Sequence, residues 1–226
     1  PNSSKIPTTY YTTDSGVGIA IKTLRNLKSD SKLRVGVVGL GAGTIAAYGK
    51  SGDYFRFYEI DPDVIALHPK IFTYLADSAA KNDIIEGDGR IKMNEENKQN
   101  FDIIVLDAFS SDAIPVHLMT SEAFSTYLRH LNPDGVIACN ISNRHLDLTP
   151  VTSGIAENYD LQHIYIVKKR GTQETFAVAS SWILLTRNMD FVSDQRIKES
   201  SSSIQRDFKS TLWTDQFSNL LSVMEF

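Results

Sequence analysis

A glycine-rich turn between two apolar strands constrains the fold of this chain more than any other feature. Residues 34–39 read Arg-Val-Gly-Val-Val-Gly and are followed by Leu-Gly-Ala-Gly, which places glycines at Gly39, Gly41 and Gly43. Glycine lets the backbone turn sharply out of a buried strand and approach a ligand that a Cβ atom would push away. We therefore predict a strand, a ligand-binding turn and a helix, in that order.

Glu59 ends the next apolar strand and lies 20 residues after Gly39. At this spacing a carboxylate can accept hydrogen bonds from both ribose hydroxyls of a bound nucleoside. A dinucleotide fingerprint would place its third glycine at position 44, but that residue is Thr44 and the glycine is Gly43. The spacing favours an S-adenosylmethionine type of ligand over a nicotinamide dinucleotide. The alternative is a strand-to-helix turn that binds no ligand.

Composition and charge fit a compact enzyme domain. The chain has 226 residues, of which 42% are hydrophobic, enough for one α/β domain with a substantial core. Its net charge is −4 and it has no basic stripe, so nucleic acid is not an expected partner. The single cysteine, Cys139, lies in an apolar run, and we interpret it as a buried thiol.

The order of apolar runs and breakers predicts a doubly wound, mostly parallel sheet of seven strands that ends in an antiparallel hairpin. This is the class I methyltransferase, Rossmann-like, arrangement. Strands 34–39 and 101–106 are continuous apolar runs, as expected when helices cover both faces of the sheet. The other predicted strands are 54–59, 83–86, 135–141, 161–167 and 176–186, and the predicted helices are 43–49, 62–76, 119–131 and 148–158.

We predict a single catalytic domain over residues 1–226 that binds an S-adenosylmethionine type of nucleoside. Residues 1–30 are interpreted as a truncated lead-in and residues 190–226 as a tail that docks on the domain. The chain begins with Pro1 and not with Met, so we expect a piece of a longer protein. No run approaches the roughly 18 apolar residues of a membrane span. The expected location is the cytoplasm, with the soluble domain of a membrane protein as the alternative.

Acidic residues follow the strands that come after the glycine turn. Glu59 and Asp61 follow the second predicted strand, Asp88 follows the third, and Asp107 and Asp112 follow the fourth. Because the carboxyl ends of parallel strands meet at one edge of a sheet, we expect these carboxylates to form one site. Asp61 precedes a proline, and we interpret it as a helix cap.

Four segments together resemble the spermidine synthase (polyamine aminopropyltransferase) family. They are the glycine turn, Phe-Tyr-Glu-Ile-Asp at 57–61, Gly-Asp-Gly at 87–89, and Asp-Ala-Phe-Ser-Ser-Asp-Ala-Ile-Pro at 107–115. The likeness is greatest to bacterial spermidine-synthase-like domains, some of which are fused to a transporter-like membrane region. The resemblance covers about residues 30 to 190.

The resemblance implies transfer of an aminopropyl group from decarboxylated S-adenosylmethionine to a polyamine or another amine. By this likeness Glu59 would hold the ribose and Asp88 the adenine end. Asp107 and Asp112 would face the acceptor amine, with Asp112 as the preferred proton acceptor. An amine attacks only when it is neutral, so a nearby carboxylate must take its proton. No ligand spacing in the sequence supports a metal, and none is expected.

Tyr11 and His117 complete the candidate set as substrate-binding residues. A phenol can form a hydrogen bond with an amine, so Tyr11 is a candidate for the acceptor pocket, with a packing role as the alternative. His117 is a candidate second proton relay, with a local hydrogen bond at a loop-to-helix junction as the alternative.

Two departures from the family keep other functions open. Aminopropyltransferases usually carry an acid inside the glycine turn, where this chain has Ala42, and their N-terminal Tyr-His-Glu segment has no clear counterpart in residues 10–18. A methyltransferase that uses intact S-adenosylmethionine and a catalytically silent nucleoside-binding module of a transporter-fused protein are therefore the alternatives. A homodimer, and covalent continuity with a membrane region outside this chain, are also open.

Overall fold

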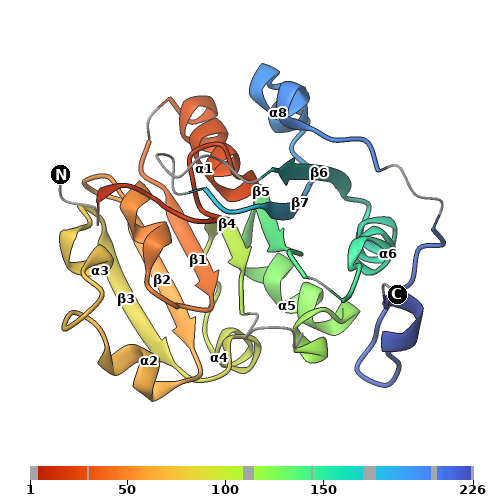
Figure 1. Ribbon diagram of the computed structural model, residues 1–226, viewed down its shortest axis with the longest axis horizontal. Helices are drawn as coiled ribbons and strands as arrows, with labels where there is room; N and C mark the ends of the chain where they lie inside the picture. Colours follow the sequence, from red (N-terminus) through yellow and green to blue (C-terminus); the bar gives the residue numbers. More distant parts are fainter. Residues whose placement is uncertain are drawn as a thin grey trace.

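A seven-stranded sheet forms the centre of the computed structural model, which describes residues 5–29, 31–108, 115–143, 145–169, 177–204 and 208–224. The strands are β1 (Arg34–Val38), β2 (Tyr54–Glu59), β3 (Lys81–Glu86), β4 (Phe101–Leu106), β5 (Leu131–Asn140), β6 (Gln162–Lys168) and β7 (Ser180–Thr186). Their order in the sheet is β3-β2-β1-β4-β5-β7-β6 (Figure 1). Strands β1 to β5 pair in parallel, and β7 runs antiparallel to both of its neighbours. The predicted fold class is confirmed.

Helices flank the sheet on both faces. The α-helices are α1 (Gly16–Leu27), α2 (Pro62–Ala66), α3 (Tyr74–Asp77), α4 (Gly89–Glu95), α5 (Ser121–His130), α6 (Thr149–Tyr159), α7 (Met189–Ser193) and α8 (Gln195–Ser200). Short 3-10 helices are η2 (Thr44–Tyr48), η3 (Val116–Leu118) and η5 (Leu220–Val223). No helix in the described segments is both long and apolar enough to cross a bilayer.

The predicted strands 34–39, 54–59 and 101–106 are confirmed to within one residue. The helix predicted at 43–49 is the 3-10 helix η2. The single helix predicted at 62–76 is wrong: the structure has α2 and α3 with Pro69 between them. Proline lacks an N–H and disfavours helical backbone in the residue before it, so a helix cannot run through this point without disruption.

Four α-helices, α1, α4, α7 and α8, lie outside the helices predicted from the sequence. Helix α1 lies inside the segment interpreted as a lead-in, and Ser15 caps it by accepting a hydrogen bond from Gly18 N. A Cβ at Gly16 would stand 2.3 Å from Cβ of Trp182, so the start of α1 packs directly on β7. Helix α4 follows β3 directly, and Asp88 caps it.

The apolar core is split between the two faces of the sheet. Alternate residues of β4 belong to different clusters: Ile104 and Leu106 pack on one face, and Ile103 and Val105 on the other. Helices α4, α5 and α6 cover the first face, and α1, η2, α7 and α8 cover the second. Trp213 in the tail is fully buried in the first cluster, which fixes this part of the tail to the domain.

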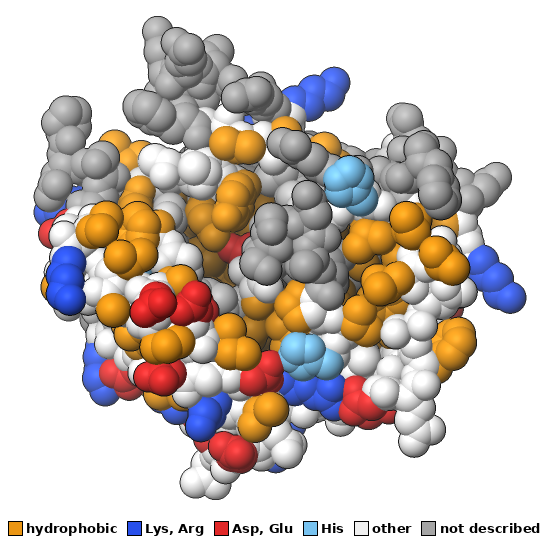
Figure 2. All heavy atoms as spheres, turned by 60° about the horizontal axis from the view of Figure 1, so that its bottom comes forward, with side chains coloured by type: hydrophobic (Ala, Val, Ile, Leu, Met, Phe, Trp, Pro, Cys, Tyr) orange, Lys and Arg blue, Asp and Glu red, His pale blue; other side chains and the backbone are white. Residues whose placement is uncertain are grey.

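The strand order reverses between β1 and β4, where open α/β sheets bind their ligands. The chain after these two strands stays close together, because Asp107 N donates to Val38 O at 2.9 Å. The carboxyl ends of these strands point to the bottom of Figure 1 and come forward in Figure 2.

Candidate active site

An open cleft of about 450 Å³ lies at the carboxyl ends of the central strands. Figure 2 shows this face hollowed near its centre, with acidic side chains in and beside the hollow and hydrophobic side chains around it. Among the lining residues are most members of the predicted site, namely Tyr11, Gly39, Gly41, Glu59, Asp88, Asp107 and His117. The fold therefore brings together residues that are up to about 106 positions apart in the sequence.

Glu59 fixes the glycine turn to the end of β2. Its Oε2 accepts a hydrogen bond from Leu40 N at 2.8 Å, and its Oε1 accepts one from Asp61 N at 2.9 Å. Only 8% of the residue is exposed. A carboxylate oxygen can accept more than one hydrogen bond, so Glu59 retains capacity for hydroxyl groups of a ligand in the cleft.

The three glycines of the turn have different surroundings. A Cβ at Gly39, where φ is +98°, would stand 2.4 Å from the Asp107 carbonyl oxygen, so this residue must be glycine for β1 and β4 to approach. A Cβ at Gly41 would meet nothing within 4 Å, which leaves room for a ligand. Gly43 does not line the cleft; it faces Leu75 near α3.

Asp88 has two partners at the rim of the cleft. Its Oδ1 accepts a hydrogen bond from Ile91 N at 2.9 Å, which caps α4, and its Oδ2 lies 2.7 Å from His117 Nε2. The His117 side chain is 49% exposed. Asp88 therefore caps α4 and lines the cleft at the same time.

Asp107, which also lines the cleft, is the centre of a polar cluster. The Tyr11 hydroxyl donates a short hydrogen bond to its Oδ2, and Asn140 Nδ2 donates to its Oδ1 at 2.7 Å. Burial raises the pKa of Asp107 to about 6, although both hydrogen bonds act to lower it. Burial and the negative charge of Asp107 raise the pKa of Tyr11 well above its usual value, so the phenol stays protonated and donates.

The charge of the cleft has one sign. Four carboxylates line it, from Glu59, Asp61, Asp88 and Asp107, and no lysine or arginine occurs among its described lining residues. A region of this charge attracts cations and repels anions. Of these acids, Asp61 also caps α2 as predicted, since its Oδ1 accepts a hydrogen bond from Asp63 N at 2.8 Å.

Asn140 is a site residue that the sequence analysis missed. It is only 5% exposed at the end of β5, and its Oδ1 accepts a hydrogen bond from Ser142 N at 3.0 Å, which orients its amide toward Asp107. The available signal was a polar residue at the carboxyl end of a strand, the same signal that identified the acids. Asp112, the predicted proton acceptor, lies outside the described residues.

Cys139 is fully buried, as predicted, and burial raises the pKa of its thiol. In the described part of the chain, no group of three or more His, Cys, Asp and Glu side chains is arranged to hold a metal ion.

The middle of the chain is similar in sequence to a known family. Residues 50–156 match the spermine/spermidine synthase domain. A polyamine aminopropyltransferase of Vibrio vulnificus is 30% identical over 114 residues, which cover 47% of this chain and 37% of that protein. A probable polyamine aminopropyl transferase of Bifidobacterium longum is 28% identical over 114 residues, or 47% of this chain and 23% of that protein. The matches thus span well under half of these relatives.

Solved structures show the same fold. A probable spermidine synthase from Corynebacterium glutamicum superposes with a TM-score of 0.65 at 19% identity, over 88% of this chain and 73% of that one. Human methyltransferase-like protein 13, solved with S-adenosylhomocysteine, superposes with a TM-score of 0.55 at 17% identity. The superposition covers 85% of this chain and 93% of that one. Together with the family match, these findings confirm the predicted resemblance to the spermidine synthase family.

Proposed function

We propose that this chain is a spermidine-synthase-like transferase that moves an aminopropyl group from decarboxylated S-adenosylmethionine to a polyamine. The observation that carries the proposal is the cleft lined by four carboxylates and by no described lysine or arginine. The donor carries a sulfonium and an ammonium group, and the acceptor is a polycation, so both substrates match this charge. The family match of residues 50–156 supports the same reaction.

The donor would bind on the side of the glycine turn. Gly39 and Gly41 let the backbone approach the nucleoside, and Glu59 would accept the ribose hydroxyls with its remaining capacity. Asp88 would lie at the adenine end, where its Oδ2 is held by His117. In this arrangement the sulfonium would face Asp107, which also lines the cleft.

The transfer is a substitution at carbon. The neutral amine nitrogen attacks the carbon of the aminopropyl chain next to sulfur, a C–N bond forms, and the C–S bond breaks. Its electron pair stays on sulfur, so the sulfonium becomes the neutral thioether of methylthioadenosine. The nitrogen then loses a proton, which a carboxylate accepts. A pKa of about 6 lets Asp107 be ionised at neutral pH and still take up a proton during the reaction.

Two acids are candidates for this proton. The sequence resemblance prefers Asp112, and the surroundings of Asp107 suit it for positioning the amine or for accepting the proton itself. Variants Asp107→Asn and Asp112→Asn, each assayed with saturating donor and acceptor, separate these roles. If Asp112→Asn turns over like the unchanged protein, Asp107 is the acceptor.

Identification of the product tests the proposal. The purified protein is incubated with a polyamine and either decarboxylated or intact S-adenosylmethionine, and the nucleoside product is identified by mass spectrometry. We expect methylthioadenosine and an amine heavier by one aminopropyl group from the decarboxylated donor. Formation of S-adenosylhomocysteine identifies a methyltransferase instead, and the absence of either product with a donor that binds identifies a silent binding module.

Methyl transfer is the second candidate, because Ala42 offers no anion to an aminopropyl ammonium beside the glycine turn. If the proposed reaction is correct, Ala42→Asp should increase the preference for the decarboxylated donor over methylthioadenosine. We expect an increase of about fivefold, because a partly exposed ion pair contributes about this much to affinity. Dissociation constants of both ligands for both proteins measure this. A protein without the substitution that already prefers the decarboxylated donor strongly would show that another acid of the cleft holds the ammonium.

A further inference from the structure

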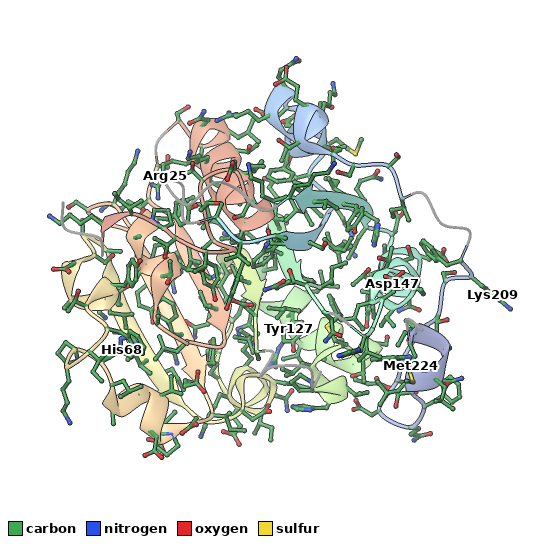
Figure 3. All side chains as sticks on the ribbon, in the orientation of Figure 1. Arg25, His68, Tyr127, Asp147, Lys209 and Met224 are labelled. Carbon is green, nitrogen blue, oxygen red and sulfur yellow. The ribbon has the colours of Figure 1, made fainter. Side chains whose placement is uncertain are left out.

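His68 contacts the glycine turn from outside the cleft. It lies in the segment between α2 and α3, on the left of Figure 3, and its Nε2 is 3.0 Å from the carbonyl oxygen of Gly41. A carbonyl only accepts, so Nε2 carries the hydrogen and donates it. The other ring nitrogen, Nδ1, is buried and has no hydrogen-bond partner among the described residues. The ring therefore makes its polar contact in one direction, toward the turn.

Gly41 is the part of the turn that needs such a contact. Its φ is +49° and nothing lies within 4 Å of a Cβ built on it, so packing does not fix its backbone. The residues on either side of Gly41 are held by hydrogen bonds. Before it, Leu40 N donates to the Glu59 carboxylate, and after it, Gly43 N donates to the Leu40 carbonyl oxygen at 2.8 Å. Because glycine passes between backbone conformations at little cost, the peptide between these two anchors is free to rotate unless its carbonyl is held.

The imidazole ring is itself held in place. A Cβ at Gly43 would stand 3.1 Å from His68 Cε1, so the ring lies against the turn, and the Phe72 ring lies 5.5 Å from it, centroid to centroid. His68 is not among the residues that line the cleft, whereas Gly41 is. Any effect of His68 on a ligand must therefore pass through the backbone of the turn.

We propose that His68 is a positioning residue for the adenosyl donor: it holds the Gly41 carbonyl so that the turn has its binding conformation before the ligand arrives. The part that concerns the donor depends on the function proposed above. A turn that is already ordered avoids the entropy cost of ordering on binding, and affinity rises accordingly.

A matched pair of polar variants tests the proposal. His68→Gln keeps an N–H donor at about the reach of Nε2, whereas His68→Asn is too short to reach Gly41. Phe72→Leu is the control for packing, because leucine keeps an apolar side chain beside the His68 ring and removes no hydrogen-bonding group. Circular dichroism and thermal unfolding establish that each variant is folded.

The first measurement needs no ligand. Hydrogen–deuterium exchange is followed in peptides that contain residues 39–44 of the free protein. We expect about fivefold to tenfold faster exchange in His68→Asn, the effect of one lost hydrogen bond, and about the original rate in His68→Gln and Phe72→Leu. Equal rates in the Gln and Asn variants would overturn the proposal.

The second measurement uses methylthioadenosine as the probe in calorimetry. We expect His68→Asn to weaken its binding about fivefold and His68→Gln to restore it, while kcat at saturating donor stays within about twofold. Binding that is unchanged in His68→Asn overturns the positioning role, even if exchange is faster. If the unchanged protein binds no adenosyl compound, the proposed function fails, and the exchange experiment still decides whether His68 holds the turn.

Discussion

The two sides of the cleft are built in different ways. On the proposed donor side, Glu59 receives both of its hydrogen bonds from backbone N–H groups that lie within 19 residues of it. On the proposed acceptor side, Asp107 is held by two side chains, Tyr11 and Asn140, which are 96 and 33 residues away. The comparison teaches that backbone groups near in sequence orient one carboxylate of the cleft, whereas side chains distant in sequence orient the other.

Glu59 and Asp107 also differ in their electrostatic surroundings. Glu59 accepts hydrogen bonds from two backbone N–H groups, whereas burial of Asp107 raises the pKa of its carboxyl to about 6 despite its two donors. Changes on the donor side should therefore alter binding, and changes on the acceptor side should alter turnover and its dependence on pH.

The strongest challenge to this division is Asp107→Asn. We expect turnover to fall by about 100-fold or more, because the acceptor amine loses the carboxylate that positions it or takes its proton. The dissociation constant of methylthioadenosine should stay within about threefold, measured by calorimetry. Asp83→Asn is the control, since Asp83 bonds to Tyr54 and does not line the cleft. Equal losses in binding and turnover would show that the two sides are not separate.

Glu59→Gln tests the proposed donor side of the cleft. Glutamine offers one carbonyl oxygen where two backbone N–H groups need acceptors, so the turn loses a hydrogen bond to a charged group. We expect the dissociation constant of methylthioadenosine to rise by about 10-fold to 100-fold, with kcat at saturating donor within about threefold. Glu86→Gln, at an exposed carboxylate at the end of β3, should bind normally. A loss confined to kcat would contradict the assignment of Glu59 to donor binding.

Asn140→Ala tests the role of Asp107 through the pH dependence of activity. Its hydrogen bond stabilises the charged form of Asp107, so removing it should raise the pKa of that carboxyl above about 6, by about one unit. In the proposed mechanism the ionised form of Asp107 is the active one, so the acidic limb of kcat/KM should move to higher pH. Activity should fall several-fold near pH 6.5 and approach the unchanged protein near pH 8, estimates that follow from the one-unit shift.

Ser142→Ala is the matched control for that experiment. Its backbone N–H, and not its side chain, donates to Asn140, and its hydroxyl pairs with the backbone of Ser181. The acidic limb should therefore stay in place. A limb that moves equally in both variants would mean that the loop is disturbed and that Asn140 has no specific effect on Asp107.

The smallest effect is expected for His117→Gln. The side chain of His117 is half exposed, so water and salt screen its contact with Asp88. Calorimetry should show less than about a threefold change in the dissociation constant of methylthioadenosine. A change of tenfold or more would mean that His117 contacts the ligand directly.

Local patterns explain which parts of the fold were predictable. Strands β2 and β4 were predicted at their observed bounds, because their apolar runs end at breakers and need no information from elsewhere. Helix α1 was not predicted, because Gly16 and Gly18 at its start lower helix propensity. The structure requires both glycines, since a Cβ would meet Trp182 at the first and the Thr12 carbonyl at the second.

In the candidate site, too, local sequence patterns predict one part and not the other. The donor side follows from the spacing of Gly39 and Glu59, which is fixed by one strand, one turn and the next strand. On the proposed acceptor side, Tyr11 pairs with Asp107 over a sequence separation of 96 residues, and no local spacing indicates such a contact. Tyr11 could be named only as a candidate, and the amide of Asn140 was overlooked because its role depends on a neighbour in the sheet.

The position of β7 between β5 and β6 has a consequence for the order in which the chain can fold during synthesis. Strands β1 to β5 can pair as they leave the ribosome, but the outer edge of β5 has no partner until residues 180–186 have emerged. That edge includes the apolar run Val136, Ile137, Ala138 and Cys139, and an unpaired apolar edge is a template for aggregation. A nascent chain that has not yet reached β7 therefore exposes this apolar edge, and pairing with β7 closes it.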